Sequence, residues 1–179
     1  MSVMCSYGGA VLERYIFVFI LLTFLNCGTP PTDLASKTGL HLIPATGEEI
    51  LEAVENADAK VILVNAWATW CQPCVEEFPD IMAVHQKYKN QGLKLILISA
   101  DFENQADDAL AFLKKQGVDF PTYLKSGKDM AFINTLDPNW SGALPATWIY
   151  DSKGNKRHFW QGKTSREKFE KKILDVLTN

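Results

Sequence analysis

The sequence is poor in the residues that hold metal ions or staple small folds. It has four cysteines and three histidines, and the histidines lie far apart in the chain. A zinc or copper site needs several Cys or His ligands close together, and a disulfide-rich scaffold needs several cysteine pairs. Cys71 and Cys74 form one closely spaced pair, and no second pair or histidine cluster accompanies it.

Clusters of basic residues, internal repeats and low-complexity tracts are absent as well. The 18 lysines and arginines are balanced by 21 acidic residues, and the formal net charge is -3. A nucleic-acid-binding protein needs a basic stripe, so no nucleic-acid partner is expected. Hydrophobic residues make up 47% and charged residues 22% of the 179 positions, which is typical of globular proteins. This length predicts one folded domain with appended segments.

Long apolar runs are limited to residues 15–25, which carry no charge and follow Arg14. The run is shorter than the ~20 residues that span a membrane, and it is typical of a secretory signal peptide. Cys27 follows, and the pattern is similar to a bacterial lipoprotein signal in which that cysteine is lipidated. We therefore expect a signal segment over residues 1–27, a linker over 28–38 and the folded domain over 39–179. The alternatives are an uncleaved anchor with an incidental Cys27 and a cleaved soluble form.

Hydrophobic periodicity predicts alternating strands and helices in the rest of the chain. Strands are expected at 40–43, 60–68, 93–99, 120–124, 145–150 and 156–161. Helices are expected after a capping pattern at 46–49, over 71–90, 106–116 and 128–136, and after a second capping pattern at 164–167. The alternation implies parallel strands with helices on both faces, and the closing hairpin implies antiparallel strands. The prediction is an α/β fold with a mixed central sheet flanked by helices.

Two prolines bear on the bounds of these elements. Pro44 is expected to close the first strand, because a proline cannot donate a hydrogen bond to a neighbouring strand. Pro79 lies inside the expected helix over 71–90 and is expected to kink it.

Cys71 and Cys74 lie where the buried strand over 60–68 meets the following helix. At a helix start, unpaired backbone N–H groups and the helix dipole favour a thiolate, which is the nucleophile of thiol–disulfide exchange. Cys74 lies one turn further in, so we expect it to be more buried and to resolve the mixed disulfide, while Trp70 shields the site. A metal site and a pair of inert core cysteines stay open as alternatives.

The segment 64–79, VNAWATWCQPCVEEFP, resembles the active-site stretch of the TlpA/ResA-like thiol–disulfide oxidoreductases. These proteins are membrane-tethered, exported members of the thioredoxin superfamily. Leu144–Trp148 is similar to the cis-proline loop of the family, and residues 120–136 match the insertion that distinguishes it from thioredoxin. The resemblance extends from about His41 to the C-terminus. It implies a thioredoxin-like fold with a strand–helix insertion before the cis-proline loop.

The resemblance assigns roles to the residues of the expected site. Cys71 is the attacking thiol of a redox-active disulfide, and Cys74 is the resolving thiol. Pro145 is the cis-proline that faces the disulfide, and Leu144 beside it presents a backbone edge to the substrate. Trp70 and Leu144 are therefore the expected substrate-binding residues.

Glu77 matches the acidic residue that the family places near its cysteines, where it tunes their acidity and relays protons. The alternative is a solvated charge on the helix surface. Asn65 stands where thioredoxin has a buried aspartate that serves the resolving thiol, and an amide cannot act as a base at neutral pH. The acid–base function is therefore expected at Glu77.

Gln72 and Pro73, between the two cysteines, include no histidine of the kind that stabilises the reduced thiolate in strong oxidants. We therefore expect a monomeric dithiol reductant of protein disulfides, without a cofactor, tethered at the periplasmic face of a bacterial cell envelope. Such a protein needs electrons from a membrane donor, and the family suggests apocytochrome c as one client. The rival interpretations are a copper chaperone, a peroxiredoxin-like peroxidase on the same fold, and a non-catalytic interaction module.

Overall fold

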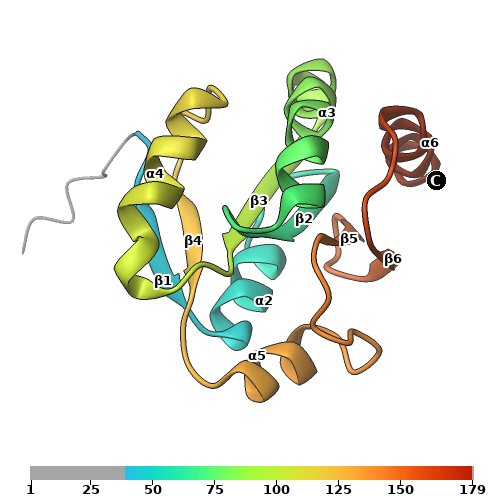
Figure 1. The fold of residues 1–179 in the computed structure, drawn as a ribbon. Helices are drawn as coiled ribbons and strands as arrows, with labels where there is room; N and C mark the ends of the chain where they lie inside the picture. The colour runs from blue at the N-terminus through green and yellow to red at the C-terminus, as the bar shows by residue number, and fades with distance from the viewer. Residues whose placement is uncertain (1–38, 179) are drawn as a thin grey trace, which may run out of the picture. The chain divides into compact units, whose positions relative to one another are not determined.

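A six-stranded mixed sheet organises residues 39–178, the part of the chain that the computed structural model describes (Figure 1). The strands are β1 (Leu42–Ala45), β2 (Val61–Trp67), β3 (Leu93–Ser99), β4 (Thr122–Lys125), β5 (Ala146–Asp151) and β6 (Lys156–Gln161). Their order across the sheet is β1-β4-β3-β2-β5-β6. β1, β4, β3 and β2 are parallel, whereas β5 is antiparallel to β2 and β6 is antiparallel to β5. The predicted mixed sheet is confirmed; the expected signal segment, Cys27 and the linker lie outside the described residues.

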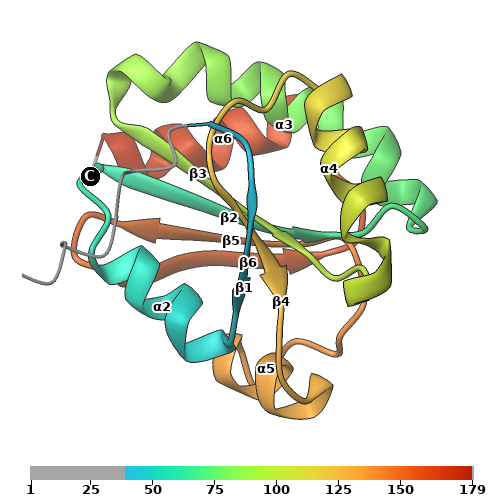
Figure 2. The same ribbon diagram turned by 90° about the vertical axis from the view of Figure 1, so that its left-hand side faces the viewer.

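Helices cover both faces of this sheet. They are α2 (Gly47–Glu55), α3 (Gln72–Tyr88), α4 (Ala106–Lys115), α5 (Asp129–Leu136) and α6 (Arg166–Leu177), with short 3-10 turns η1 (Lys89–Gln91) and η2 (Glu103–Gln105). One hydrophobic core includes side chains of α3, α4 and α6, and a second includes side chains of α2 and α5. Figure 2 shows the sheet between α3 and α6 on one side and α2 and α5 on the other. Within residues 39–178, no helix combines the length and apolar character needed to cross a membrane.

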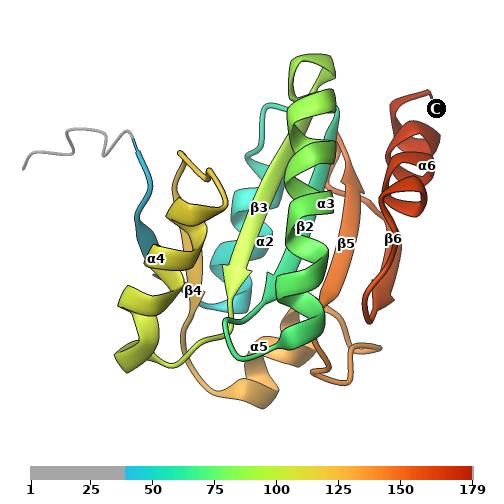
Figure 3. The ribbon, with the colours of Figure 1, turned by 45° about the horizontal axis from the view of Figure 1, so that its top comes forward.

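β2 is the central strand, and all seven of its residues are buried. It pairs with β3 on one side and with β5 on the other, and Figure 3 shows it between these two strands and beneath α3. Because both faces of the strand are covered, its sequence is an apolar run interrupted only by Asn65, rather than an alternating pattern. The carboxyl end of β2 at Trp67 leads directly into the turn that carries Cys71.

The first strand differs from its prediction. It does not end at Pro44 but continues to Ala45, because β1 is an edge strand, where a residue without a backbone N–H group is tolerated. In α3, Pro79 lies inside the helix, which continues to Tyr88.

The two predicted helix caps have different outcomes. Thr46 and Glu49 form the capping box of α2, as the sequence predicts. At the start of α6, the side chain of Ser165 makes no capping hydrogen bond to the helix. The backbone N–H of Thr164, one residue earlier, instead donates to the carboxylate of Glu77. The backbone of the residue before the N-cap of α6 is therefore bound by a side chain of α3.

Candidate active site

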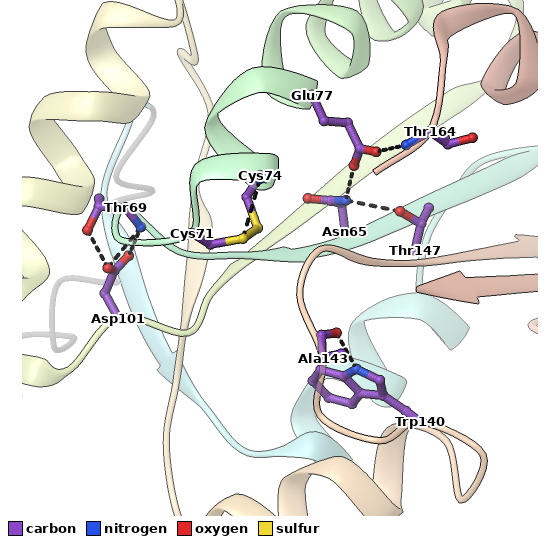
Figure 4. Close-up of a disulfide and its surroundings, with 10 residues drawn as sticks. All are labelled: Asn65, Thr69, Cys71, Cys74, Glu77, Asp101, Trp140, Ala143, Thr147 and Thr164. Atoms are coloured by element: carbon purple, nitrogen blue, oxygen red, sulfur yellow. Dashed lines mark hydrogen bonds between the residues drawn. A yellow bond between two sulfur atoms is a disulfide. The ribbon is translucent and has the colours of Figure 1, made fainter. Parts of the chain in front are cut away.

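A disulfide joins Cys71 and Cys74 at the start of α3, with an S–S distance of 2.12 Å (Figure 4). Cys71 is the N-cap residue of the helix, and its sulfur accepts the backbone N–H of Cys74 at 3.3 Å. Pro73 lies in the first turn, where the missing N–H group costs no helical hydrogen bond. Cys71 is 6% exposed and Cys74 1% exposed, so Cys74 is the more buried residue of the pair, as the sequence predicts.

The turn before Cys71 is held by Asp101, a residue that sequence reasoning missed. The carboxylate of Asp101 accepts the backbone N–H of Thr69 at 3.0 Å and its hydroxyl at 2.5 Å. It also accepts the hydroxyl of Ser99, the last residue of β3, at 2.7 Å. Asp101 follows the carboxyl end of a strand adjacent to β2, and this placement at one edge of a parallel sheet is the signal that sequence reasoning had available.

Glu77 is buried one turn beyond Cys74 and is 0% exposed. Its Oε1 accepts a hydrogen bond from the side chain of Asn65 at 3.4 Å, and its Oε2 accepts one from the backbone N–H of Thr164 at 2.6 Å. Burial raises the pKa of this carboxyl to about 7, although the two hydrogen bonds act in the opposite direction. The alternative of a solvated surface charge is therefore wrong, and Glu77 is a buried group that titrates near neutral pH.

Asn65 connects Glu77 to the strand that follows the cis-proline loop. Its side chain lies on β2 and is fully buried. Nδ2 donates to Glu77 at 3.4 Å and to the hydroxyl of Thr147 at 3.0 Å (Figure 4). Thr147 pairs directly with Asn65 in the register between β2 and β5. Sequence reasoning missed Thr147, because its place beside Asn65 depends on this pairing.

The peptide bond between Leu144 and Pro145 is cis, as the family resemblance implies. Ala146, the next residue, pairs with Ala66 near the carboxyl end of β2, so the cis-proline loop lies at the end of the sheet from which the Cys71 turn emerges. The carbonyl of Pro145 accepts the backbone N–H of Gly162 at 2.7 Å. Gly162 has a φ of 88°, a left-handed conformation that favours glycine.

The segment that leads into the cis-proline loop is fixed by buried polar contacts. Asp137 accepts hydrogen bonds from Lys156 at 2.6 Å and from the indole of Trp148 at 3.3 Å. Burial opposes the charge of Asp137, but the contacts with Lys156 and Asn139 outweigh it and lower its pKa. The indole of Trp140 is 5% exposed, packs edge-on against Trp148 and thereby supports the same segment.

An apolar cavity of about 280 Å³ lies next to this site. Trp70 and Leu144, the two expected substrate-binding residues, both line it, together with Trp140 and Phe102. Trp70 is 58% exposed and Phe102 70% exposed, which is unusual for large apolar side chains. The structure therefore brings the two predicted residues to one hydrophobic opening.

A metal site requires several ligand side chains close together, which the described part of the chain does not provide. Across residues 39–178, no group of three or more His, Cys, Asp and Glu side chains is placed to hold a metal ion. The three histidines are engaged separately: His41 with the carbonyl of Gly39, His85 against the ring of Phe120, and His158 with Asp175. Within this part of the chain, Cys71 and Cys74 therefore have no third ligand.

The fold and the disulfide at the start of α3 place this chain in the thioredoxin-like class, with an added strand and helix, β4 and α5, before the cis-proline loop. The chain belongs to the AhpC/TSA family, whose model matches residues 43–159. Its similarity to ResA and HelX proteins confirms the resemblance to TlpA/ResA-like members of the thioredoxin superfamily.

Two relatives and one solved structure show the extent of this similarity. The thiol-disulfide oxidoreductase ResA of Bacillus thuringiensis (strain Al Hakam) is 29% identical over 118 residues, which are 65% of this chain and 64% of that protein. The thiol:disulfide interchange protein HelX of Rhodobacter capsulatus is 29% identical over 150 residues, 82% of this chain and 79% of that protein. A thiol:disulfide interchange protein of the thioredoxin family from Chlorobium tepidum TLS has the same fold, with a TM-score of 0.57 and 22% identity over 70% of this chain and 83% of that one.

Proposed function

We propose that this protein is a thiol–disulfide oxidoreductase that reduces protein disulfides through Cys71 and Cys74. The observation that carries the proposal is the Cys71–Cys74 disulfide at the start of α3, where the Cys71 sulfur accepts a backbone N–H group. A helix start stabilises a thiolate in this position. The similarity to proteins named ResA and HelX supports the same chemistry.

The steps of thiol–disulfide exchange follow from the different surroundings of Cys71 and Cys74. In the reduced protein, the Cys71 thiolate attacks a substrate disulfide; a mixed disulfide forms and the substrate's other sulfur leaves as a thiolate. The Cys74 thiol then loses its proton to the Glu77 carboxylate, and its sulfur attacks that of Cys71. The Cys71–substrate bond breaks, the second substrate thiolate leaves, and the protein is left as the disulfide. Glu77 suits the proton transfer because burial raises its pKa to about 7.

The substrate is held by the surface around the disulfide. The backbone at Leu144 offers an edge for an extended segment, and the side chains of Trp70 and Leu144 line the apolar cavity beside it. A polypeptide fits this opening better than a small hydrophilic disulfide does, because two exposed aromatic side chains gain by being covered.

The proposed location rests on the sequence pattern of residues 1–38, and the proposed partners rest on the family resemblance. We propose export to the periplasmic face of a bacterial cell envelope, lipidation at Cys27, and electrons from a membrane donor, with apocytochrome c as one client. Mass spectrometry of the mature N-terminus tests the anchor: a lipid-modified Cys27 is expected, and an unmodified chain beginning at Met1 would rule it out.

Insulin reduction tests the activity. The protein with a dithiol reductant is expected to accelerate precipitation of the insulin B chain, and Cys71→Ser is expected to abolish the acceleration. Equal rates with and without the protein would refute the proposal and favour a non-catalytic interaction module. A reduction potential near that of strong oxidants, about -120 mV, would reverse the proposed direction.

Peroxidase activity is less well supported by the contacts around Cys71. The hydroxyl of Thr69 is engaged by Asp101, and the two arginines in residues 39–178 lie in β6 and α6, paired with Asp151 and Glu170. Hydrogen peroxide consumption measured alongside insulin reduction separates the two activities.

A further inference from the structure

Asn65 is buried in the core but leaves one polar atom without a partner. Its side chain is 0% exposed, and Nδ2 donates to Glu77 and to Thr147. The other amide atom, Oδ1, is buried and has no hydrogen-bond partner among the described residues. An acceptor that is left unsatisfied in a core destabilises the fold, so this one calls for a functional explanation.

The neighbours of the amide fix its orientation. An ionised carboxylate accepts hydrogen bonds and donates none, so the amide nitrogen of Asn65 is the atom that faces Glu77. Figure 4 shows Nδ2 directed to Glu77 and Thr147, and Oδ1 directed to the side on which the disulfide lies. The unpartnered acceptor therefore faces the redox pair.

The disulfide has no hydrogen to offer, whereas the reduced pair has one. A dithiol partner that reduces the protein supplies two electrons and two protons: the Cys71–Cys74 bond breaks, and the partner becomes a disulfide. The Cys71 sulfur, at the helix start, releases its proton to solvent and is held as a thiolate. The Cys74 sulfur, in a residue that is 1% exposed, keeps its proton because burial disfavours a thiolate.

We propose that Oδ1 of Asn65 accepts a hydrogen bond from the Cys74 thiol in the reduced protein. The proposal rests on the function proposed above, because it concerns the reduced state of the same pair. Oδ1 is unsatisfied in the oxidised protein and satisfied in the reduced one, so Asn65 stabilises the reduced form relative to the disulfide. Asn65 is a positioning residue: it holds the Cys74 thiol until the mixed disulfide forms and the proton passes to Glu77.

An amide suits this position better than a carboxylate does. Asn65 donates to the Glu77 carboxylate and at the same time offers an acceptor on the side of the cysteines. A carboxylate at position 65 would place a second buried charge against Glu77, and like charges in one buried site are strongly unfavourable.

The test is the S–H stretching band of Cys74 in the full-length protein. Cys71→Ser keeps Cys74 as a thiol. Subtraction of the spectrum of the Cys71→Ser/Cys74→Ser variant isolates the infrared band of Cys74 from those of the two other cysteines of the chain, Cys5 and Cys27. The band is expected at the lower frequency of a hydrogen-bonded thiol. Adding Asn65→Ala is expected to raise this frequency.

Thr147→Val is the matched control, because it removes a contact of Nδ2 and leaves Oδ1 in place. It is expected to leave the Cys74 band unchanged. A Cys74 band at the same frequency with asparagine and with alanine at position 65 would overturn the proposal, since the thiol would then donate to another acceptor.

The redox equilibrium is a second measurement that needs no protein substrate. Asn65→Ala is expected to lower the equilibrium constant for reduction about tenfold, which makes the potential about 30 mV more negative for a two-electron couple. An unchanged or more positive potential would contradict the proposal. A protein that shows the band shift but does not reduce insulin would contradict the proposed function while supporting this inference.

Discussion

The buried carboxyl of Glu77 makes the stability of the fold depend on pH. Burial raises its pKa to about 7 from an ordinary value of 4.5. Between these two values, the folded protein binds more protons than the unfolded chain does, so the free energy of unfolding falls as the pH rises. At 1.36 kcal/mol per pKa unit, the difference of about 2.5 corresponds to about 3 kcal/mol. Ionisation of Glu77 therefore destabilises the fold by this full amount above pH 7 and not at all below pH 4.5.

Glu77→Gln removes this titration and keeps an atom that accepts a hydrogen bond. We expect the stability of the variant relative to the natural protein to increase by about 3 kcal/mol between pH 4.5 and pH 8. Urea unfolding of both oxidised proteins at a series of pH values measures it. Glu76→Gln is the control, because Glu76 is an exposed neighbour paired with Lys163. A difference that stays constant with pH would show that Glu77 titrates normally and that the burial argument is wrong.

Three further substitutions test other contacts of the site. Cys74→Ser is expected to trap a covalent complex of Cys71 with a protein disulfide substrate, seen on a non-reducing gel and removed by dithiothreitol, whereas Cys71→Ser traps none. Asp101→Ala removes the charge-assisted hydrogen bonds to the turn before Cys71 and is expected to lower the free energy of unfolding by about 2 kcal/mol in urea. An unchanged urea midpoint would show that these hydrogen bonds do not stabilise the fold. Lys156→Met leaves Asp137 buried without its cation and is expected to cost about 3 kcal/mol, and the Lys156→Met/Asp137→Leu double variant recovers most of this loss.

The local pattern of the sequence was enough to predict the layers of the fold. A continuous apolar run predicts β2 as a strand covered on both faces, and the switch to helical spacing after Cys71 predicts α3. The cis bond before Pro145 was predicted from the family resemblance and not from local chemistry, because a proline at a strand start is usually trans.

The spacing of residues along α3 was compatible with both a buried and a solvated Glu77. Cys74, Glu77 and Phe78 share the inner face of α3, so a charge at this position is buried if it has partners. The partner that decides the question is the backbone of Thr164, 87 residues away in the chain. The contact of Thr69 with Asp101 spans 32 residues in the same way. Such contacts depend on tertiary packing and strand register, which no short pattern contains.

The buried carboxylate lies on α3, at Glu77, rather than on β2. This position connects the helix that carries the cysteines to the cis-proline loop. The segment 162–164 touches both: the N–H of Thr164 binds Glu77, and the N–H of Gly162 binds the carbonyl of Pro145. A neutral carboxyl is a weaker hydrogen-bond acceptor than a carboxylate. In the proposed exchange, a proton passed from Cys74 to Glu77 would therefore weaken the contact with Thr164, and through this segment it would act on the cis-proline loop. The side chain of Asn65 instead contacts Glu77 and Thr147, so in the proposed exchange it is the acidic residue of α3 that would link proton transfer to the proposed substrate-binding edge.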